Sequence, residues 1–268
     1  MKVKTNNIVP LLRGLCLLTL VLLPCASQAA DLTLAQAQAG AAKGDAEAEF
    51  VLGKAFYTGN GVPQDYAKAF DLYQKSANQG FAKAQNNLAS MYGKGEGVKA
   101  DPKAAAEWYR KAAEQGSVYA QINLAEVLKA GAGVPKDYKE AAEWYQKAAD
   151  QGTFEAYTLL GKLYDHGGPG VHRDAQKAFI YYQKAADQGD TDAQVELGRH
   201  YFTGLGTKQD KITGYKWVLI SANQGNDDAK ELQLELQPQI SPNDIVKASE
   251  LAADYKAPKP NLPAKAQD

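Results

Sequence analysis

Histidine is the side chain most often used for metal binding and for proton transfer near neutral pH, and this chain has three: His166, His172 and His200. His166 and His172 share one stretch with Asp165 and Asp174, a set of groups that could ligate a metal ion. Their spacing matches no recognised ligand pattern, so solvated loop residues are the simpler interpretation. The sequence therefore predicts neither a metal nor another cofactor.

Glycine pairs such as Gly59-Asn60-Gly61 could cradle a phosphate through their backbone N–H groups. The pair recurs at 95–97 and 131–133, and no copy carries the lysine and serine of a nucleotide-binding loop. The copies therefore predict turns. No Ser-His-Asp or Cys-His arrangement recurs at equivalent places, so the sequence favours a protein that is not an enzyme.

A four-residue ending occurs five times at a spacing close to 36 residues and divides the chain into repeats. Each ending is Ala, then Asn, Glu or Asp, then Gln-Gly, at 77–80, 113–116, 149–152, 186–189 and 222–225. A period of this size indicates a solenoid, in which each unit buries its apolar face only by stacking on its neighbours. The fourth unit has one extra residue, in the loop 167–170. Such proteins usually present an extended surface to a partner.

Each repeat contains two helical patterns separated by a glycine turn. The first has a small residue, a leucine four positions later, then a small residue and usually an aromatic, as in Ala156, Leu160, Gly161 and Tyr164. This spacing places them on one helix face, and the small residues allow a second helix to approach closely. An aspartate then opens the second helix as its N-cap, at 65, 101, 137, 174 and 210.

The second helix of each repeat is predicted to end at the Gln-Gly turn, where glycine fits a left-handed cap. All three tryptophans of the chain stand at one position of this helix, which indicates that they belong to the core; they are Trp108, Trp144 and Trp217.

The combined pattern resembles the Sel-1-like repeat, a longer-loop relative of the tetratricopeptide repeat, over residues 45–225. It reads Ala-x-x-x-Leu-Gly-x-x-Tyr-x-x-Gly-x-Gly-Val-x-x-Asp-x-x-Lys-Ala-x-x-Trp-Tyr-x-Lys-Ala-Ala-x-Gln-Gly. The resemblance implies an all-α fold, a right-handed solenoid of stacked antiparallel helix pairs, with a role in protein–protein contact. It weakens in the fifth repeat, where Thr207, Gly214 and Val218 replace the family's residues.

Some secreted, cysteine-rich members of this family have been linked with penicillin binding and weak β-lactamase activity. Their signature is a regularly spaced cysteine pair that staples each repeat. The only cysteines here, Cys16 and Cys25, precede the repeats, which makes this activity a remote alternative.

Residues 1–29 have the pattern of a bacterial secretory signal peptide: basic residues, a short apolar stretch at 15–23, and small residues before a cleavage site after Ala29 or one residue later. The apolar stretch is too short for a stable membrane span. Cys25 follows Pro24 rather than the small residue that precedes a lipidated cysteine. We therefore expect a periplasmic or secreted protein with no lipid anchor and no transmembrane segment after cleavage.

The full chain has 30 basic and 31 acidic residues, so it lacks the positive charge of a nucleic-acid-binding protein. We divide it into a signal peptide at 1–29, a lead-in helix at 30–44, repeats at 45–80, 81–116, 117–152, 153–189 and 190–225, a partial repeat with a capping helix at 226–255, and a disordered tail at 256–268. Ser241, Pro242 and Asp244 predict the start of the capping helix. Its expected apolar face is Ile245, Val246, Leu251 and Ala252.

In tetratricopeptide-like stacks the first helix of each repeat lines the concave groove, so the resemblance places the partner-binding residues there. Carried over to the positions around each buried leucine, these residues are Lys54, Tyr57, Asn86, Tyr119, Glu126, Lys129, Lys162, Asp165, Arg199 and Phe202. This row varies between repeats, as expected where each unit meets a different part of one ligand.

We therefore expect a protein partner. The alternative is an envelope-assembly component that contacts peptidoglycan or an exported polysaccharide, which would instead predict clustered exposed aromatic residues with few charges.

Overall fold

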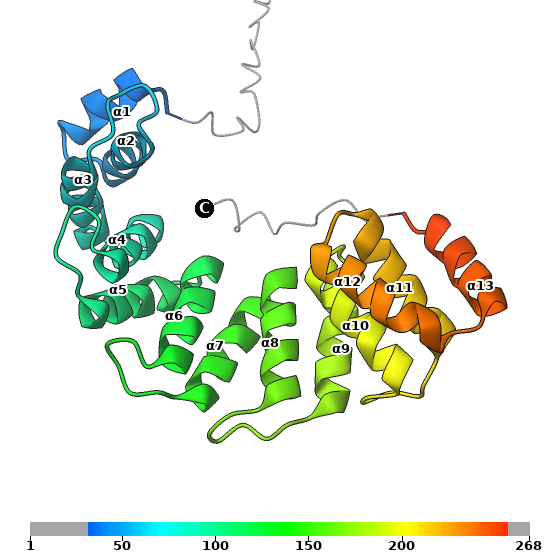
Figure 1. Cartoon of the computed structure of the whole chain (residues 1–268). Helices are drawn as coiled ribbons and strands as arrows, with labels where there is room; N and C mark the ends of the chain where they lie inside the picture. The colour runs from blue at the N-terminus through cyan, green and yellow to red at the C-terminus, as the bar shows by residue number, and fades with distance from the viewer. Residues whose placement is uncertain (1–31, 257–268) are drawn as a thin grey trace, which may run out of the picture. The chain divides into compact units, whose positions relative to one another are not determined.

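The computed structural model describes residues 32–256, and these fold into helices stacked in sequence order (Figure 1). A short lead-in helix, α1 (Leu34–Ala41), comes first. The first helices of the pairs are α2 (Ala46–Thr58), α4 (Ala82–Lys94), α6 (Val118–Ala130), α8 (Phe154–His166), α10 (Thr191–Thr203) and α12 (Asp227–Leu236). The second helices are α3 (Tyr66–Asn78), α5 (Pro102–Glu114), α7 (Tyr138–Ala149), α9 (Ala175–Ala186), α11 (Lys211–Asn223) and α13 (Pro242–Ala253), the last preceded by the 3-10 helix η1 (Gln237–Gln239).

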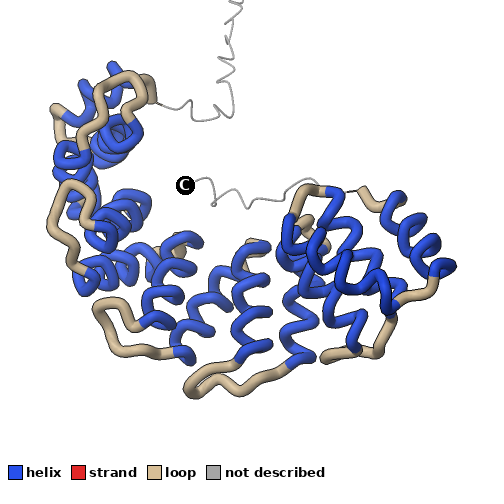
Figure 2. The backbone as a smooth tube through the Cα atoms, viewed as in Figure 1, coloured by secondary structure: helices blue, strands red, loops and turns tan. Residues whose placement is uncertain are grey.

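The first helices α4, α6, α8 and α10 each pack on the second helix of their own pair and on that of the pair before, whereas α12 and α13 both pack on α11. No strand occurs within residues 32–256, and the loops alternate regularly with the helices (Figure 2). The predicted α-solenoid is therefore confirmed. The predicted signal peptide and almost all of the predicted tail lie outside the described residues.

The helix ends follow the chemistry expected from the sequence. Each of the five aspartates that open a second helix accepts a hydrogen bond from a backbone N–H of the first turn. The glycine of each Gln-Gly turn has a positive φ, between 88° and 95°. The N-caps and the left-handed turns are both confirmed.

The apolar face expected for the capping helix α13 is partly wrong. Ser241 caps this helix as predicted, but its buried residues are Ala248 and Ala252. Val246 and Leu251 are 56% and 47% exposed. Helix α13 packs on α11 through its alanines, because small side chains allow the closest approach of two helices.

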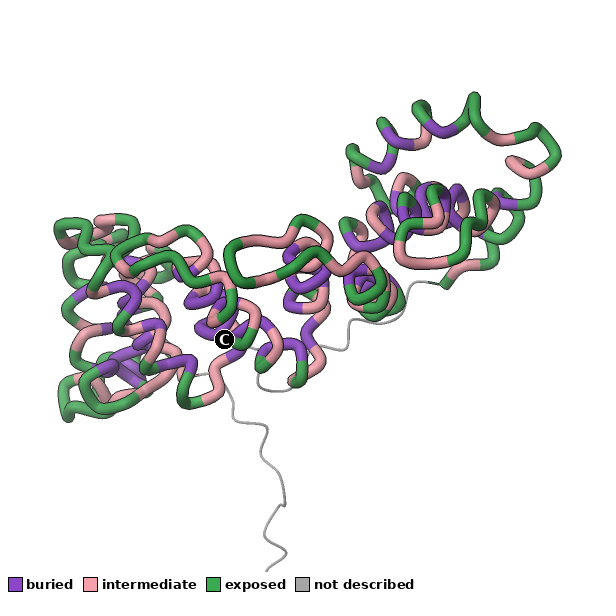
Figure 3. The backbone as a smooth tube through the Cα atoms, turned by 90° about the horizontal axis from the view of Figure 1, so that it is seen from below, coloured by how far each residue is buried: buried purple, intermediate pink, exposed green. Residues whose placement is uncertain are grey.

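The core consists of side chains packed between neighbouring helices. Buried residues therefore lie mainly in the helices, and the loops are mostly exposed (Figure 3). Glycine in a first helix admits a large ring from the second helix. A Cβ at Gly161 would lie 2.5 Å from the ring of Tyr182, which is fully buried. Trp144 and Trp217 are buried as expected, whereas Trp108 is only partly buried.

A chain of glutamine side chains links the repeats, and we call it the glutamine relay. Gln151, in a Gln-Gly turn, donates from Nε2 to Oε1 of Gln121 at 2.9 Å, and Gln121 donates to the carbonyl of Ala113 at 3.2 Å. The first bond closes one repeat, and the second joins it to the second helix of the repeat before. The same two bonds recur through Gln115 and Gln85 to Ala77, and through Gln224 and Gln194 to Ala186.

The fourth repeat has no glutamine relay. Tyr157 stands where the other repeats have Gln85, Gln121 and Gln194, and the turn glutamine Gln188 has a buried Oε1 without a hydrogen-bond partner. Tyr157 instead stacks on Tyr181, which occupies the tryptophan position, with ring centres 6.3 Å apart. Tyr181 stacks in turn on Tyr164 at 5.8 Å. An aromatic stack therefore replaces the relay in this repeat.

We expect Gln121→Met to lower the free energy of unfolding by about 2 kcal/mol, because the change removes both hydrogen bonds of Gln121, the one accepted from Gln151 and the one donated to Ala113. Chemical denaturation followed by circular dichroism measures this. Gln176→Met, on the exposed side of α9, is the matched control and is expected to change stability by less than about 0.5 kcal/mol. Equal midpoints for the two variants would contradict the role given to the relay.

Candidate functional site in the fourth repeat

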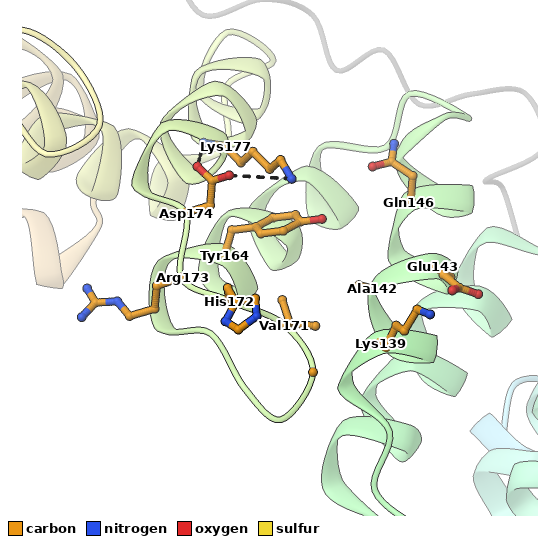
Figure 4. Close-up of a pocket in the computed structure, with 11 residues that line it drawn as sticks. Lys139, Ala142, Glu143, Gln146, Tyr164, Val171, His172, Arg173, Asp174 and Lys177 are labelled. Carbon is orange, nitrogen blue, oxygen red and sulfur yellow. Dashed lines mark hydrogen bonds and ion pairs between the residues drawn. The ribbon is translucent and has the colours of Figure 1, made fainter.

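An open pocket of about 450 Å³ lies between α7 and the loop that joins α8 to α9 (Figure 4). Its walls come from the second helix of the third repeat and from the fourth repeat. The lining residues include Lys139, Ala142, Glu143 and Gln146 of α7, Tyr164 of α8, Val171, His172 and Asp174 of the loop, and Lys177 of α9.

One cause of the pocket is the small side chain of Ala142. Phe70 and Phe179 occupy the same repeat position, and each packs edge-on against a tyrosine of the next repeat: Phe70 on Tyr92 at 5.2 Å and Phe179 on Tyr201 at 5.1 Å. Tyr164 is the corresponding tyrosine opposite Ala142, and no aromatic ring fills the space between them.

A second cause is the extra residue in the loop of the fourth repeat. In three other loops a glycine lies directly on the backbone of the preceding second helix; a Cβ at Gly97 would lie 2.3 Å from the carbonyl oxygen of Tyr66. In the fourth loop Gly168 instead lies against the ring of Tyr138. Gly168 and Val171 pair through two backbone hydrogen bonds of 2.8 and 2.9 Å, so this loop has a shape of its own beside the pocket.

The pocket combines one aromatic face with separate hydrogen-bonding groups. Lys177 Nζ lies 4.9 Å from the centre of the Tyr164 ring and 3.7 Å from Asp174 Oδ2. The Gln146 carboxamide oxygen accepts a hydrogen bond from Tyr181 at 2.6 Å. The Arg173 side chain points away from the pocket (Figure 4) and donates to the carbonyl of Asp165. This arrangement suits a polar ligand with an apolar face.

The loop between α8 and α9 also carries histidine and aspartate side chains that could bind a metal ion. Within residues 32–256 no three His, Cys, Asp or Glu side chains gather closely enough to hold a metal ion. His166 bonds through Nδ1 to the carbonyl of Lys162, and His172 is exposed at the pocket.

The residues expected to bind a partner lie along the first helices. Lys54 and Arg199 are exposed, and seven others are partly buried: Tyr57, Asn86, Tyr119, Glu126, Lys129, Lys162 and Asp165. Contacts between repeats join many of them. Asn86 accepts a hydrogen bond from Asn123 at 3.0 Å, and Lys162 lies 3.7 Å from Asp192. We call the surface that carries these nine residues the first-helix face.

Phe202 does not lie on the first-helix face. Its side chain is 3% exposed and belongs to a core cluster with Val195, Tyr215 and Leu232. The expectation of a surface residue is corrected here, because α11, α12 and α13 pack around this position. Lys211 Nζ covers the ring at 5.2 Å from its centre.

Carboxylates gather on the first-helix face over α6, α8 and α10, a feature that the sequence analysis missed. Burial, followed by the negative charge of Asp190 and Glu126, raises the pKa of Glu155. Burial is also the main cause that raises the pKa of Asp190, and Asp192 adds to it. For Glu196, burial and the charge of Asp165 together raise the pKa against the opposing effect of Arg199.

A raised carboxyl pKa destabilises the folded state at neutral pH, because the folded state binds more protons than the unfolded state just above pH 4.5. Stability contributed by Glu196 therefore falls as pH rises through the folded-state pKa. We expect Glu196→Gln to melt a few degrees above the wild type at pH 7, with the difference vanishing as pH falls to about 4.5.

Thermal melts from pH 4 to pH 7 measure this difference. Glu250→Gln, an exposed carboxylate on α13, is the control and is expected to follow the wild type at every pH. A Glu196→Gln variant that melts below the wild type across the whole range would contradict the unfavourable effect of burial and of the Asp165 charge on ionised Glu196.

Comparison with known proteins points to one family. The model of the Sel1 repeat matches five times, at residues 46–81, 82–117, 118–153, 154–190 and 191–226. No curated protein matches the sequence. Within residues 32–256 no helix is both long and apolar enough to cross a membrane.

Two solved structures are similar over most of the chain. A protective antigen of uropathogenic Escherichia coli with an SLR fold is 37% identical, with a TM-score of 0.74; the match covers 82% of this chain and 48% of that one. The present chain thus spans about half the length of that antigen. A Sel1 repeat protein from Oxalobacter formigenes is 34% identical, with a TM-score of 0.69, and the match covers 84% of this chain and 93% of that one.

Proposed function

The chain belongs to the Sel1 repeat family, and on that basis we propose that it is a non-catalytic scaffold that binds another protein in the bacterial envelope, in the periplasm or after secretion. The first-helix face supports this proposal. Its residues differ from one repeat to the next, yet contacts such as that between Asn86 and Asn123 connect them across repeats. A surface that varies along successive repeats suits one extended protein ligand, because each repeat meets a different part of it. The signal-peptide pattern of residues 1–29 supports the location.

Tyr119 and Arg199 are the residues we expect to contribute most to binding, since aromatic and arginine side chains carry a large share of interface energy. Arg199 is 45% exposed at its side chain and lies 3.8 Å from Glu196. Replacing both by alanine should abolish capture of the partner from an envelope extract while the helical signal and the melting temperature stay close to those of the wild type. Affinity capture followed by mass spectrometry measures this.

The matched control changes two exposed carboxylates of second helices, Asp71→Ala with Glu107→Ala. It should capture the same protein at the wild-type level. If this control loses the partner and the first-helix variant keeps it, the second helices form the binding surface and the proposal is wrong.

A role in contacting peptidoglycan or an exported polysaccharide is the second candidate. The pocket beside Tyr164 favours it, because an aromatic face next to polar groups matches the mixed surface of a sugar ring. The charged residues around the pocket and the scattered aromatic residues of the first-helix face favour a protein partner.

Ala142→Phe tests the second candidate, because it places in the pocket the same side chain that Phe70 and Phe179 provide in other repeats. If the pocket binds saccharide, the variant should lose at least about tenfold in affinity for soluble peptidoglycan fragments, measured by calorimetry. Ala142→Ser keeps the pocket open and serves as control. Equal affinities of the two variants for the peptidoglycan fragments would show that the pocket does not bind them.

A further inference from the structure

Three buried polar atoms without a hydrogen-bond partner lie where α8, α9 and α10 meet: Asp165 Oδ1, Tyr182 OH and His200 Nε2. Tyr182 is fully buried, His200 is 1% exposed, and the Asp165 side chain is 16% exposed. Buried polar groups are nearly always paired in folded proteins, so several unpaired atoms in one place indicate that a hydrogen-bonding partner is missing.

At least one missing partner is a donor, because Asp165 Oδ1 is a carboxylate oxygen, which only accepts. His200 Nδ1 lies 2.8 Å from the carbonyl oxygen of Leu205, and because a carbonyl only accepts, this nitrogen carries the hydrogen. Nε2 faces Asp165 Oδ2 at 3.6 Å, which is too long for a hydrogen bond. Glu196, one turn before His200 on α10, adds another carboxylate beside Asp165.

The third repeat shows what the fourth lacks. Tyr145 occupies the position of Tyr182, and its hydroxyl donates to Glu126. In the fourth repeat Lys162 stands at the position of Glu126, so the Tyr182 hydroxyl lacks this bond, and its oxygen can accept one from a donor. Burial and the charges of Glu196 and Asp165 raise the pKa of Tyr182, which keeps this hydroxyl neutral.

Two cations lie nearby, but neither pairs with Asp165 Oδ1, Tyr182 OH or His200 Nε2. Lys162 Nζ is 3.7 Å from Asp192, and Arg199 Nε is 3.8 Å from Glu196. Glu155 and Asp190 add negative charge on the same face. The surroundings therefore attract positive charge without supplying enough donors from this chain.

We propose that the cluster of Asp165, Tyr182, Glu196 and His200, the acceptor cluster, binds the guanidinium group of an arginine in a basic segment of the partner protein. This rests on the scaffold function proposed above and names the chemistry of its partner. Asp165 and Glu196 are reached from the first-helix face, since their side chains are 16% and 29% exposed. Tyr182 and His200 lie beneath them.

Arginine fits better than lysine for a geometric reason. A guanidinium offers five N–H donors in one plane, and two of them can meet a carboxylate side by side. It is also more weakly hydrated than an ammonium group, so it is easier to bring against buried acceptors.

The test uses NMR titration of the purified full chain with a synthetic peptide, acetyl-Gly-Ser-Arg-Gly-Arg-Ser-Gly-amide. Two further peptides are titrated in parallel. In one, lysine replaces both arginines; in the other, citrulline does, which is a neutral analogue of arginine with the same shape. We expect amide shifts centred on α8–α10, with affinity at least about tenfold weaker for citrulline and intermediate for lysine. Equal binding of the arginine and citrulline peptides would overturn the proposal.

Variants locate the site. Asp165→Asn combined with Glu196→Gln should weaken the arginine peptide at least about tenfold, while Asp71→Asn combined with Glu107→Gln, on second helices, should not. Tyr182→Phe keeps the buried ring and removes the unpaired hydroxyl. It should raise the melting temperature of the free chain and still weaken the peptide about threefold. Wild-type affinity in both acceptor-cluster variants would contradict the assignment.

The outcome also separates this inference from the scaffold function. If the arginine peptide fails to bind while Tyr119→Ala with Arg199→Ala still abolishes capture of the partner, the acceptor cluster is not an arginine site and the scaffold function stands.

Discussion

A helix pair of this protein has too little surface to fold alone, and the stack depends on what joins one pair to the next. Apolar packing supplies most of the stabilisation, but it is tolerant of small shifts along a helix. The glutamine relay fixes the relative position of neighbouring repeats, because a carboxamide can satisfy its donor and its acceptor only in one arrangement. Gln121 shows this most plainly: it accepts from the turn that closes its own repeat and donates to the helix that ends the repeat before. Wherever the relay is present, the spacing between repeats is fixed.

The fourth repeat departs from this rule in several places, and the departures belong together. Tyr157 removes the relay, Tyr181 takes the place of tryptophan, and the loop gains a residue. On the second-helix side a pocket opens opposite Ala142, and beneath the first-helix face three buried polar atoms lack hydrogen-bond partners. Unpaired buried groups reduce stability, and proteins tend to keep such groups where a ligand uses them. These features set the fourth repeat apart from an otherwise regular stack.

The repeat length, the helix pairs, the aspartate N-caps and the glycine turns could be predicted from sequence, because each depends on short-range chemistry repeated five times. The relay could not. Gln121 and Gln151 are 30 residues apart, and the Gln-Gly signal was already explained by its glycine. Phe202 occupies a position that is on the surface in other repeats, and only the C-terminal helices bury it. The acceptor cluster was equally hidden, since Glu196 and His200 resemble ordinary helix residues until Asp165 of the neighbouring helix is placed beside them.

The central claim is that the fourth repeat lacks the glutamine relay that stabilises the repeats on either side of it. Hydrogen exchange followed by mass spectrometry measures the stability of each helix in the free chain. Amides of α8 and α9 should exchange faster than those of α4 to α7, where the relay is complete, although all of these helices lie in the interior of the stack. Protection that is uniform from α4 to α9, or greatest in α8 and α9, would contradict the account.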